Sequence, residues 1–272
     1  MPNFLIALDS MTQRRVRLRS SNALFLGALA ALLVVTAGCS SSDATRQLSA
    51  EERYQKAMEL FNDGDYLDAI EDFRVVTLQF PGNPLSDDAQ YFLGECYFQR
   101  EEYILAAYEF ELLIRTHPTS PIIPNARFKR GMCYYELSPE WNLDQEYTKK
   151  SIDEFQALLE YYPFDPRAAD AEAKIRELNI KLAKKIYESG VIYMKMEYYR
   201  AAGLSFDQVL ERYHDTPYAE PALLRKGEVL LYRLRYGDAK RELERFLNRY
   251  PESLLRRNAE KLLEEVNKEI EG

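Results

Sequence analysis

Few side chains in this sequence could do nucleophilic, acid–base or metal chemistry, and they are widely separated. Only two histidines and three cysteines occur in 272 residues. His117 and His214 fall at turns beside proline or an acidic residue, and the glycines are scattered rather than grouped in a phosphate-binding loop. Acidic pairs such as Asp87–Asp88 fall at helix starts and loops, where negative charge suits the helix dipole. We therefore expect no catalytic residue, no metal site and no cofactor, which argues against an enzyme.

Cys39 is the cysteine whose setting does predict chemistry. Four arginines precede an apolar stretch over residues 23–37, about as long as a signal-peptide core and short of the roughly 20 residues that a spanning helix needs. The stretch ends in "TAGC" and resembles a bacterial lipoprotein signal, in which the cysteine is lipidated and becomes the new N-terminus. Thr36 stands where that signal usually has leucine. The alternative is a plain secretory signal cut near the same place, which leaves Cys39 as an ordinary thiol.

We interpret residues 1–38 as the signal peptide and residues 39–49 as a polar tether. By analogy with lipoprotein sorting, Ser40 favours release to the outer membrane, where acyl chains would anchor the protein at the periplasmic face. Residues 1–38 carry four arginines and one aspartate, so the net charge of −8 becomes −11 without them. An acidic body lacks the clustered lysine and arginine that nucleic acid requires, so we expect no nucleic-acid partner.

The body of the chain is periodic. Small residues recur with spacings of 37, 37, 59 and 37, and an apolar residue, usually phenylalanine, follows sixteen residues later in most units. A proline closes four units, because proline cannot continue a helix. The second unit carries the tetratricopeptide (TPR) pattern whole, as "LGECYF…AAYEFELLIRTHP". The small residues are Ala57, Gly94, Gly131, Gly190 and Gly227.

This pattern predicts an all-α TPR solenoid of five helix-turn-helix repeats, arranged as three plus two. Units 1–3 occupy residues 50–166, a longer connecting helix occupies 167–182, and units 4–5 with a C-terminal capping helix occupy 183–272. Extra residues around Trp141 and Pro139 predict a longer loop within the third unit. Cys96 and Cys133 share a repeat position about 10 Å apart, too far for a disulfide, so we expect buried free thiols.

A partner-binding groove is expected on the inner face of the first three units, where the TPR pattern points the fifth, ninth and twelfth positions of each first helix. These positions are rich in aromatics and methionine, which suits an extended segment with aromatic side chains. The alternative is that several of these rings simply pack between repeats. The positions are Tyr54, Met58, Phe61, Tyr91, Glu95, Phe98, Phe128, Met132 and Tyr135.

Charge is uneven along the body, which suggests different partners at its two ends. Residues 40–120 have a net charge of −10, and residues 221–272 have a net charge of +2. A solvated helix face would give the same pattern. Candidate docking residues in the C-terminal half are Arg200, Arg212, Arg225 and Arg233.

A lipoprotein signal followed by five TPR units, broken three plus two, resembles the BamD family of the outer-membrane β-barrel assembly machinery. The similar stretches are "FRVVTLQFPGNPLSDDAQYFLGECYFQREEYILAAYEF" and "LAKKIYESGVIYMKMEYYRAAGLSFDQVLERYHDT". The resemblance implies a non-catalytic, lipid-anchored scaffold that binds the POTRA domains of a BamA-like barrel subunit through its C-terminal half. It also implies that the N-terminal repeats help receive unfolded outer-membrane protein segments.

The chain departs from that family at two positions. Family members commonly have an arginine where this chain has Ser205, and that arginine contributes to docking; many have an acidic residue where this chain has Ile186. The docking charge would then come from elsewhere, with Arg200 and Arg212 as the nearest candidates. Two other functions stay open: a pilotin that escorts a secretin ring, and an envelope-remodelling enzyme or the regulator of a cell-wall enzyme.

Overall fold

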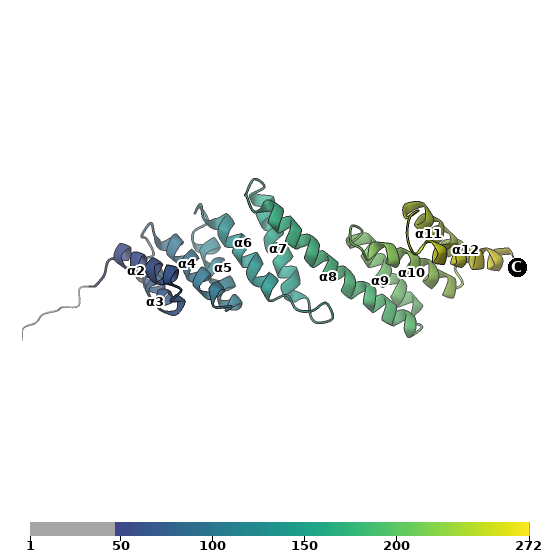
Figure 1. Ribbon diagram of the computed structural model, residues 1–272, viewed down its shortest axis with the longest axis horizontal. Coiled ribbons are helices and arrows are strands. Elements are labelled where there is room, and N and C mark those ends of the chain that lie inside the picture. The colour runs from purple at the N-terminus through teal and green to yellow at the C-terminus, as the bar shows by residue number, and fades with distance from the viewer. Residues whose placement is uncertain (1–46, 272) are drawn as a thin grey trace, which may run out of the picture. The chain divides into compact units, whose positions relative to one another are not determined.

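The computed structural model describes residues 47–271. Eleven helices lie in this range: ten form five consecutive pairs and α12 follows the last pair, as can be traced in Figure 1. The signal peptide, Cys39 and residues 39–46 of the tether lie outside the described residues. The helices are α2 (Ala50–Asp63), α3 (Tyr66–Gln79), α4 (Ser86–Gln99), α5 (Tyr103–Thr116), α6 (Ile123–Glu136), α7 (Glu146–Tyr161), α8 (Ala168–Lys195), α9 (Tyr199–Arg212), α10 (Ala219–Tyr232), α11 (Tyr236–Arg249) and α12 (Arg256–Glu271).

Each helix packs against the helix before it and the helix after it, and α10 also contacts α12. This nearest-neighbour pattern is the packing of a helical solenoid, so the predicted all-α TPR fold is confirmed. No helix in the described residues is both long and apolar enough to cross a bilayer.

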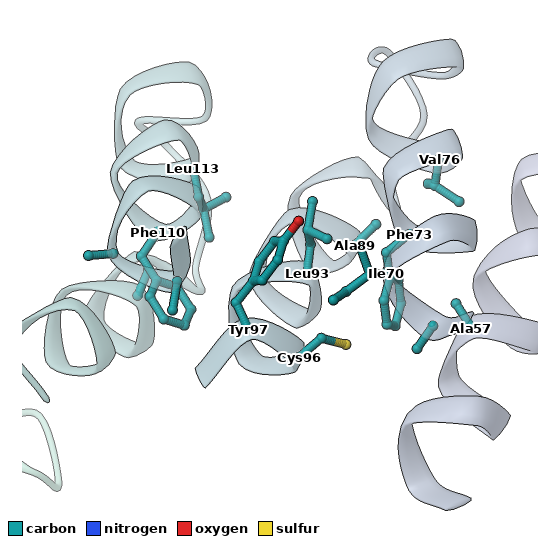
Figure 2. Packing of buried hydrophobic residues seen from close by; sticks show 14 of the residues in the cluster. Ala57, Ile70, Phe73, Val76, Ala89, Leu93, Cys96, Tyr97, Phe110 and Leu113 are labelled. Carbon is teal, nitrogen blue, oxygen red and sulfur yellow. The ribbon is translucent and has the colours of Figure 1, made fainter. Parts of the chain in front are cut away.

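The two helices of a repeat approach closely because a small residue faces a buried ring. A Cβ atom built on Gly94 would lie 2.7 Å from Phe110, and one on Gly131 would lie 2.6 Å from Phe155. Ala57 takes this position in the first repeat, and it is fully buried. Figure 2 shows the resulting core across the first two repeats, with Phe73 and Phe110 enclosed by their neighbours.

The turns inside four of the five repeats share one backbone conformation, whereas the longer α6–α7 loop of the third repeat does not, since Leu137 there has a φ of −78°. A residue just past the first helix has positive φ: Gly64 at +86°, Glu101 at +61°, Glu197 at +62° and Leu234 at +55°. With left-handed backbone at this point, the amide groups that follow can donate to the last carbonyl oxygens of the helix. Asp65 N, for example, donates to Leu60 O at 2.9 Å. Glycine adopts it without strain, whereas a bulky side chain does so at a cost.

The loop between α6 and α7 is held in place by its own residues and by α8. Gln145 is buried, and its side-chain amide donates to the carbonyl oxygens of Glu140 at 2.8 Å and Leu143 at 3.1 Å. Lys181 Nζ donates to Ser138 Oγ at 2.8 Å, and Lys184 Nζ lies 4.9 Å from the centre of the Trp141 ring. The extra residues therefore form an ordered loop packed on α8.

Helix α8 is one continuous helix of 28 residues. Its first half packs on α7, and its second half pairs with α9 as the first helix of the fourth repeat. Residues 167–182, interpreted from the sequence as a connecting helix, thus run without a break into that repeat.

Candidate partner-binding surfaces

A polar contact joins the two helices of a repeat at one recurring position. The acidic residue that precedes the buried ring of the second helix meets a basic or amide group from the first helix. Asp72 accepts from Arg53 at 2.5 Å and from Lys56 at 2.7 Å. Three of the other four repeats have the same contact: Gln90 Nε2 to Glu109 Oε2 at 2.6 Å, Arg130 Nη1 to Glu154 Oε1 at 2.9 Å, and Lys226 Nζ to Glu242 Oε1 at 3.1 Å, where the buried residue that follows is Leu243 rather than a ring.

The fourth repeat lacks this contact. Ser205 occupies the acidic position, and its hydroxyl donates to the carbonyl oxygen of Ala201 in its own helix, at 3.2 Å. Ile186 occupies the matching position on α8 and packs partly buried against the cluster around Phe206. The fourth repeat is thus the one described repeat in which this position is free of charge.

Ser205 and Ile186 line a hollow of about 420 Å³ between α7, α8, α9 and the loop before α7. We call it the inter-repeat hollow. Its cations are Lys149, Lys185 and Arg212, and its acidic residue is Asp144. Within the described chain Arg212 forms no ion pair. The remaining lining residues are Gln145, Leu182, Ser189, Tyr193, Gln208 and Tyr213.

The four predicted docking arginines do not lie together. Arg212 lines the inter-repeat hollow, whereas Arg200 and Arg233 line a second hollow, formed by α9, α10 and α11. Arg225 lines a third, beside α12, and its guanidinium is already paired with Glu228 at 2.6 Å. Of the two arginines nearest in sequence to Ser205, only Arg212 shares its hollow.

The predicted groove residues of the first two repeats are half-buried and in contact with other rings. Tyr54 lies 5.8 Å from Phe73 and 6.5 Å from Phe92, measured between ring centres. Phe61 and Tyr91 also contact Phe92, at 5.3 and 5.5 Å. Met58 packs partly buried against the same core. These side chains therefore hold neighbouring repeats together, the role that the alternative interpretation gave them.

Glu95 is the acidic member of the predicted groove, and it is not available as a free charge. Only 6% of the residue is exposed. Its Oε2 pairs with Lys129 Nζ at 2.8 Å, and the same ammonium lies 4.7 Å from the centre of the Phe98 ring. Lys129 was not among the predicted groove residues, because it lies 34 residues from Glu95 and meets it only through stacking of the second and third repeats.

In the third repeat, α8 contributes side chains over the predicted groove positions. The Tyr135 hydroxyl donates to Glu177 Oε1 at 2.6 Å, and Lys174 Nζ lies 3.7 Å from the ring centre. Phe128 and Met132 pack against the cluster that contains Leu178 of α8. That the nine groove residues bind a partner segment stays a prediction. In the third repeat, such a segment would contact Tyr135, Phe128 and Met132 alongside the side chains of α8 that already pack against them.

Burial sets the ionisation of several groups near these surfaces. It raises the pKa of Tyr54 to about 12, with Asp88 and Asp87 adding to the effect. It also raises the pKa of the Cys96 thiol to about 12. Both Cys96 and Cys133 are free and buried, as expected. No cluster of histidine, cysteine and acidic residues in residues 47–271 could hold a metal ion.

Replacing Glu109 with glutamine is expected to remove a pH-dependent cost to stability. Burial raises the pKa of Glu109 above its ordinary value of 4.5, so the native state holds this proton more tightly than the unfolded chain. The free energy of unfolding therefore falls as pH rises above 4.5 and the Glu109 carboxyl loses its proton, so the cost is larger at neutral pH than at pH 4. Glutamine keeps an oxygen that can accept from Gln90.

We expect E109Q to match or exceed the parent protein's free energy of unfolding at neutral pH by up to about 1 kcal/mol, and to lose part of the fall with pH. Urea denaturation between pH 4 and pH 8 measures both effects. Glu59→Gln, at an exposed position, is the control. A loss of about 1 kcal/mol or more at neutral pH would show that the Glu109 charge stabilises the fold, through Arg74.

The sequence matches a family model named YfiO, described as "Outer membrane lipoprotein", over residues 46–235. It also matches a tetratricopeptide repeat model over residues 221–253. Among curated proteins, it is 27% identical to "Outer membrane protein assembly factor BamD" of Rickettsia prowazekii, over 84% of this chain and 92% of that one. It is 29% identical to the protein of the same name from Caulobacter vibrioides, over 75% and 69%.

Among solved structures, the TPR2AB domain of yeast Sti1 in complex with pHSP90 is similar at 13% identity, with a TM-score of 0.40, over 82% of this chain and 87% of that one.

Proposed function

The chain belongs to the YfiO family of outer membrane lipoproteins, and from this premise we propose that it is a scaffold of the outer-membrane β-barrel protein assembly complex. The observation that carries the proposal is the family match, which spans the first four repeats and enters the fifth. Two curated relatives named as outer membrane protein assembly factors support it. The scaffold is non-catalytic and works without a cofactor.

We infer that a lipid on Cys39 holds the protein at the periplasmic face of the outer membrane. The N-terminal repeats help receive unfolded outer-membrane protein segments. Their half-buried rings, such as Tyr54 and Phe61, would contribute their exposed edges to this contact. An aromatic surface of this kind suits a segment with aromatic side chains.

Docking to the POTRA domains of a BamA-like barrel subunit is assigned to the inter-repeat hollow. Three features support this choice. The fourth repeat has no charge of its own at the position of Ser205 and Ile186, so a partner's polar group would not compete with an internal ion pair. Arg212 is unpaired within the described chain. Lys149 and Lys185 add two cations against Asp144 alone, which favours an acidic partner surface.

Affinity capture tests the proposal. The tagged, full-length protein is purified with mild detergent from the outer membrane of its native cell, and the co-purifying proteins are identified and quantified. We expect a POTRA-bearing barrel subunit in a ratio near one to one. A secretin or a cell-wall enzyme without a barrel subunit would overturn the function and leave the fold unchanged. An unrelated outer-membrane lipoprotein with the same tag is the control.

A further inference from the structure

The second hollow, between α9, α10 and α11, has an apolar floor and a cationic rim. Its volume is about 300 Å³. Gly203, Val229 and Leu230 form the floor, and the absence of a side chain at Gly203 leaves the space above Val229 open. We call it the arginine hollow, because Arg200, Arg233, Arg235 and Arg241 all line it.

The charged groups of this hollow are only partly neutralised by one another. Lys226 Nζ bridges Asp207 at 2.7 Å and Glu242 at 3.1 Å. Asp238 accepts from both Arg235 and Arg241. Neither Arg200 nor Arg233 forms an ion pair in the described part of the chain. Five cations against three carboxylates leave the hollow with two positive charges, carried by the two unpaired guanidinium groups.

Leu234 lies between Arg233 and Arg235 in the turn beside this hollow, and its conformation is costly. Its φ is +55°, the left-handed region in which the first repeat has Gly64. A leucine there is strained, and 71% of it is exposed, so packing does not repay the strain. Glu101 and Glu197 adopt the same conformation at this point of their repeats, so what distinguishes Leu234 is a large apolar side chain that is exposed next to Arg233, which forms no ion pair in the described chain.

We propose that the arginine hollow binds an acidic segment of a partner protein. Carboxylates of the segment pair with Arg200 and Arg233, an apolar side chain enters above Gly203 and Leu230, and Leu234 covers it from the turn. This surface is separate from the inter-repeat hollow, and it does not depend on the identity of the protein that docks there.

A peptide segment fits this hollow better than an anionic lipid surface does. A bilayer presents a continuous plane of negative charge, which would meet the carboxylates of Asp207, Asp238 and Glu242 as well as the arginines. A segment can place its carboxylates at the two unpaired guanidinium groups alone, in bidentate geometry. It also brings an apolar side chain for the floor.

The test uses the full-length protein in phosphatidylcholine nanodiscs and a short fluorescein-labelled peptide in which aspartate and leucine alternate. A matched peptide with asparagine in place of aspartate is the control ligand. Fluorescence anisotropy should show binding of the acidic peptide only, weakened about tenfold or more by R200A/R233A and weakened further at high salt. Arg257→Ala, at an exposed position on α12, is the matched charge control.

Leu234→Gly separates binding from stability. Glycine relieves the positive-φ strain, so the thermal midpoint of L234G should equal or exceed that of the parent protein, while its affinity for the acidic peptide falls several-fold. A structural role for Leu234 predicts the opposite, a lower midpoint with unchanged affinity. If Arg233 only stabilises the C-terminal end of α10, where it is the capping residue, R233A should lower the thermal midpoint and leave peptide binding intact.

Three results would overturn the proposal. The first is equal peptide binding by the parent protein and R200A/R233A. The second is loss of peptide binding when phosphatidylglycerol nanodiscs replace phosphatidylcholine, which would identify an anionic headgroup as the occupant. The third is a dimer in detergent solution that R200A/R233A dissociates, which would identify a second copy of this chain.

Discussion

Replacing Arg212 with glutamate is expected to weaken docking of a POTRA-bearing barrel subunit by about 2 kcal/mol, or roughly thirtyfold in affinity. Arg212 is the unpaired guanidinium in the inter-repeat hollow. The parent hollow carries three cations against one carboxylate, and R212E carries two of each. An acidic partner surface would therefore lose its electrostatic complement and meet a like charge. Surface plasmon resonance with the purified POTRA domains measures the effect.

A second substitution shows whether position or net charge matters. Ser205 lines the same hollow as Arg212. Adding S205R to the R212E variant should therefore return a guanidinium to the hollow and recover part of the affinity that R212E loses. Arg200→Glu is the matched control, because Arg200 lies in the arginine hollow; it should leave POTRA binding within about twofold of the parent value. Weaker docking in R200E together with unchanged docking in R212E would place the docking surface in the arginine hollow and contradict this prediction.

Replacing Gly131 with alanine is expected to lower the free energy of unfolding by about 2 kcal/mol, although alanine is the better helix former. The added Cβ would lie 2.6 Å from Phe155 Cε1 and 2.8 Å from its Cδ1. The ring is fully buried and cannot rotate away. Ser151 Oγ donates to the Gly131 carbonyl oxygen at 2.8 Å across the same contact, so separating α6 from α7 would break that bond.

Two further glycine-to-alanine variants separate the cost of the steric contact from the gain in helix propensity. Gly227→Ala should cost less, because its Cβ would meet Cδ2 and Cγ of Leu243, an aliphatic side chain that can change rotamer more readily than the Phe155 ring. Gly237→Ala in α11 should stabilise the protein by about 0.5–1 kcal/mol, because nothing lies within 4 Å of its added Cβ. Chemical denaturation followed by circular dichroism ranks the three variants. A neutral G131A would mean that the helices separate more easily than their contacts suggest.

The repeat architecture could be predicted because each position of a repeat has one strict physical demand. The crossing point needs a small residue, and the facing position needs a large apolar one. Both Gly94 with Phe110 and Gly131 with Phe155 meet these demands, and a sequence period of 37 residues displays them. Burial of the cysteines followed from the same frame, since Cys96 and Cys133 share one repeat position.

The binding surfaces were harder to predict because they depend on contacts between repeats. The sequence gives no direct sign that Lys129 neutralises Glu95, or that α8 places Lys174 over Tyr135. The recurring acid before the buried ring was present in the sequence, as in Asp72 and Glu109, but its partners lie at two different offsets in the first helix. Arg200 and Arg212, twelve residues apart on α9, could not be assigned to separate hollows without coordinates.

The two buried thiols make local opening of the chain measurable without any added label. Cys96 and Cys133 are 0% exposed, and the burial that raises their pKa disfavours the reactive thiolate. An alkylating reagent can therefore reach them only when the second or third repeat transiently unfolds. Their alkylation rates report the free energy of that opening for two adjacent repeats separately, in the intact protein and with its partner bound.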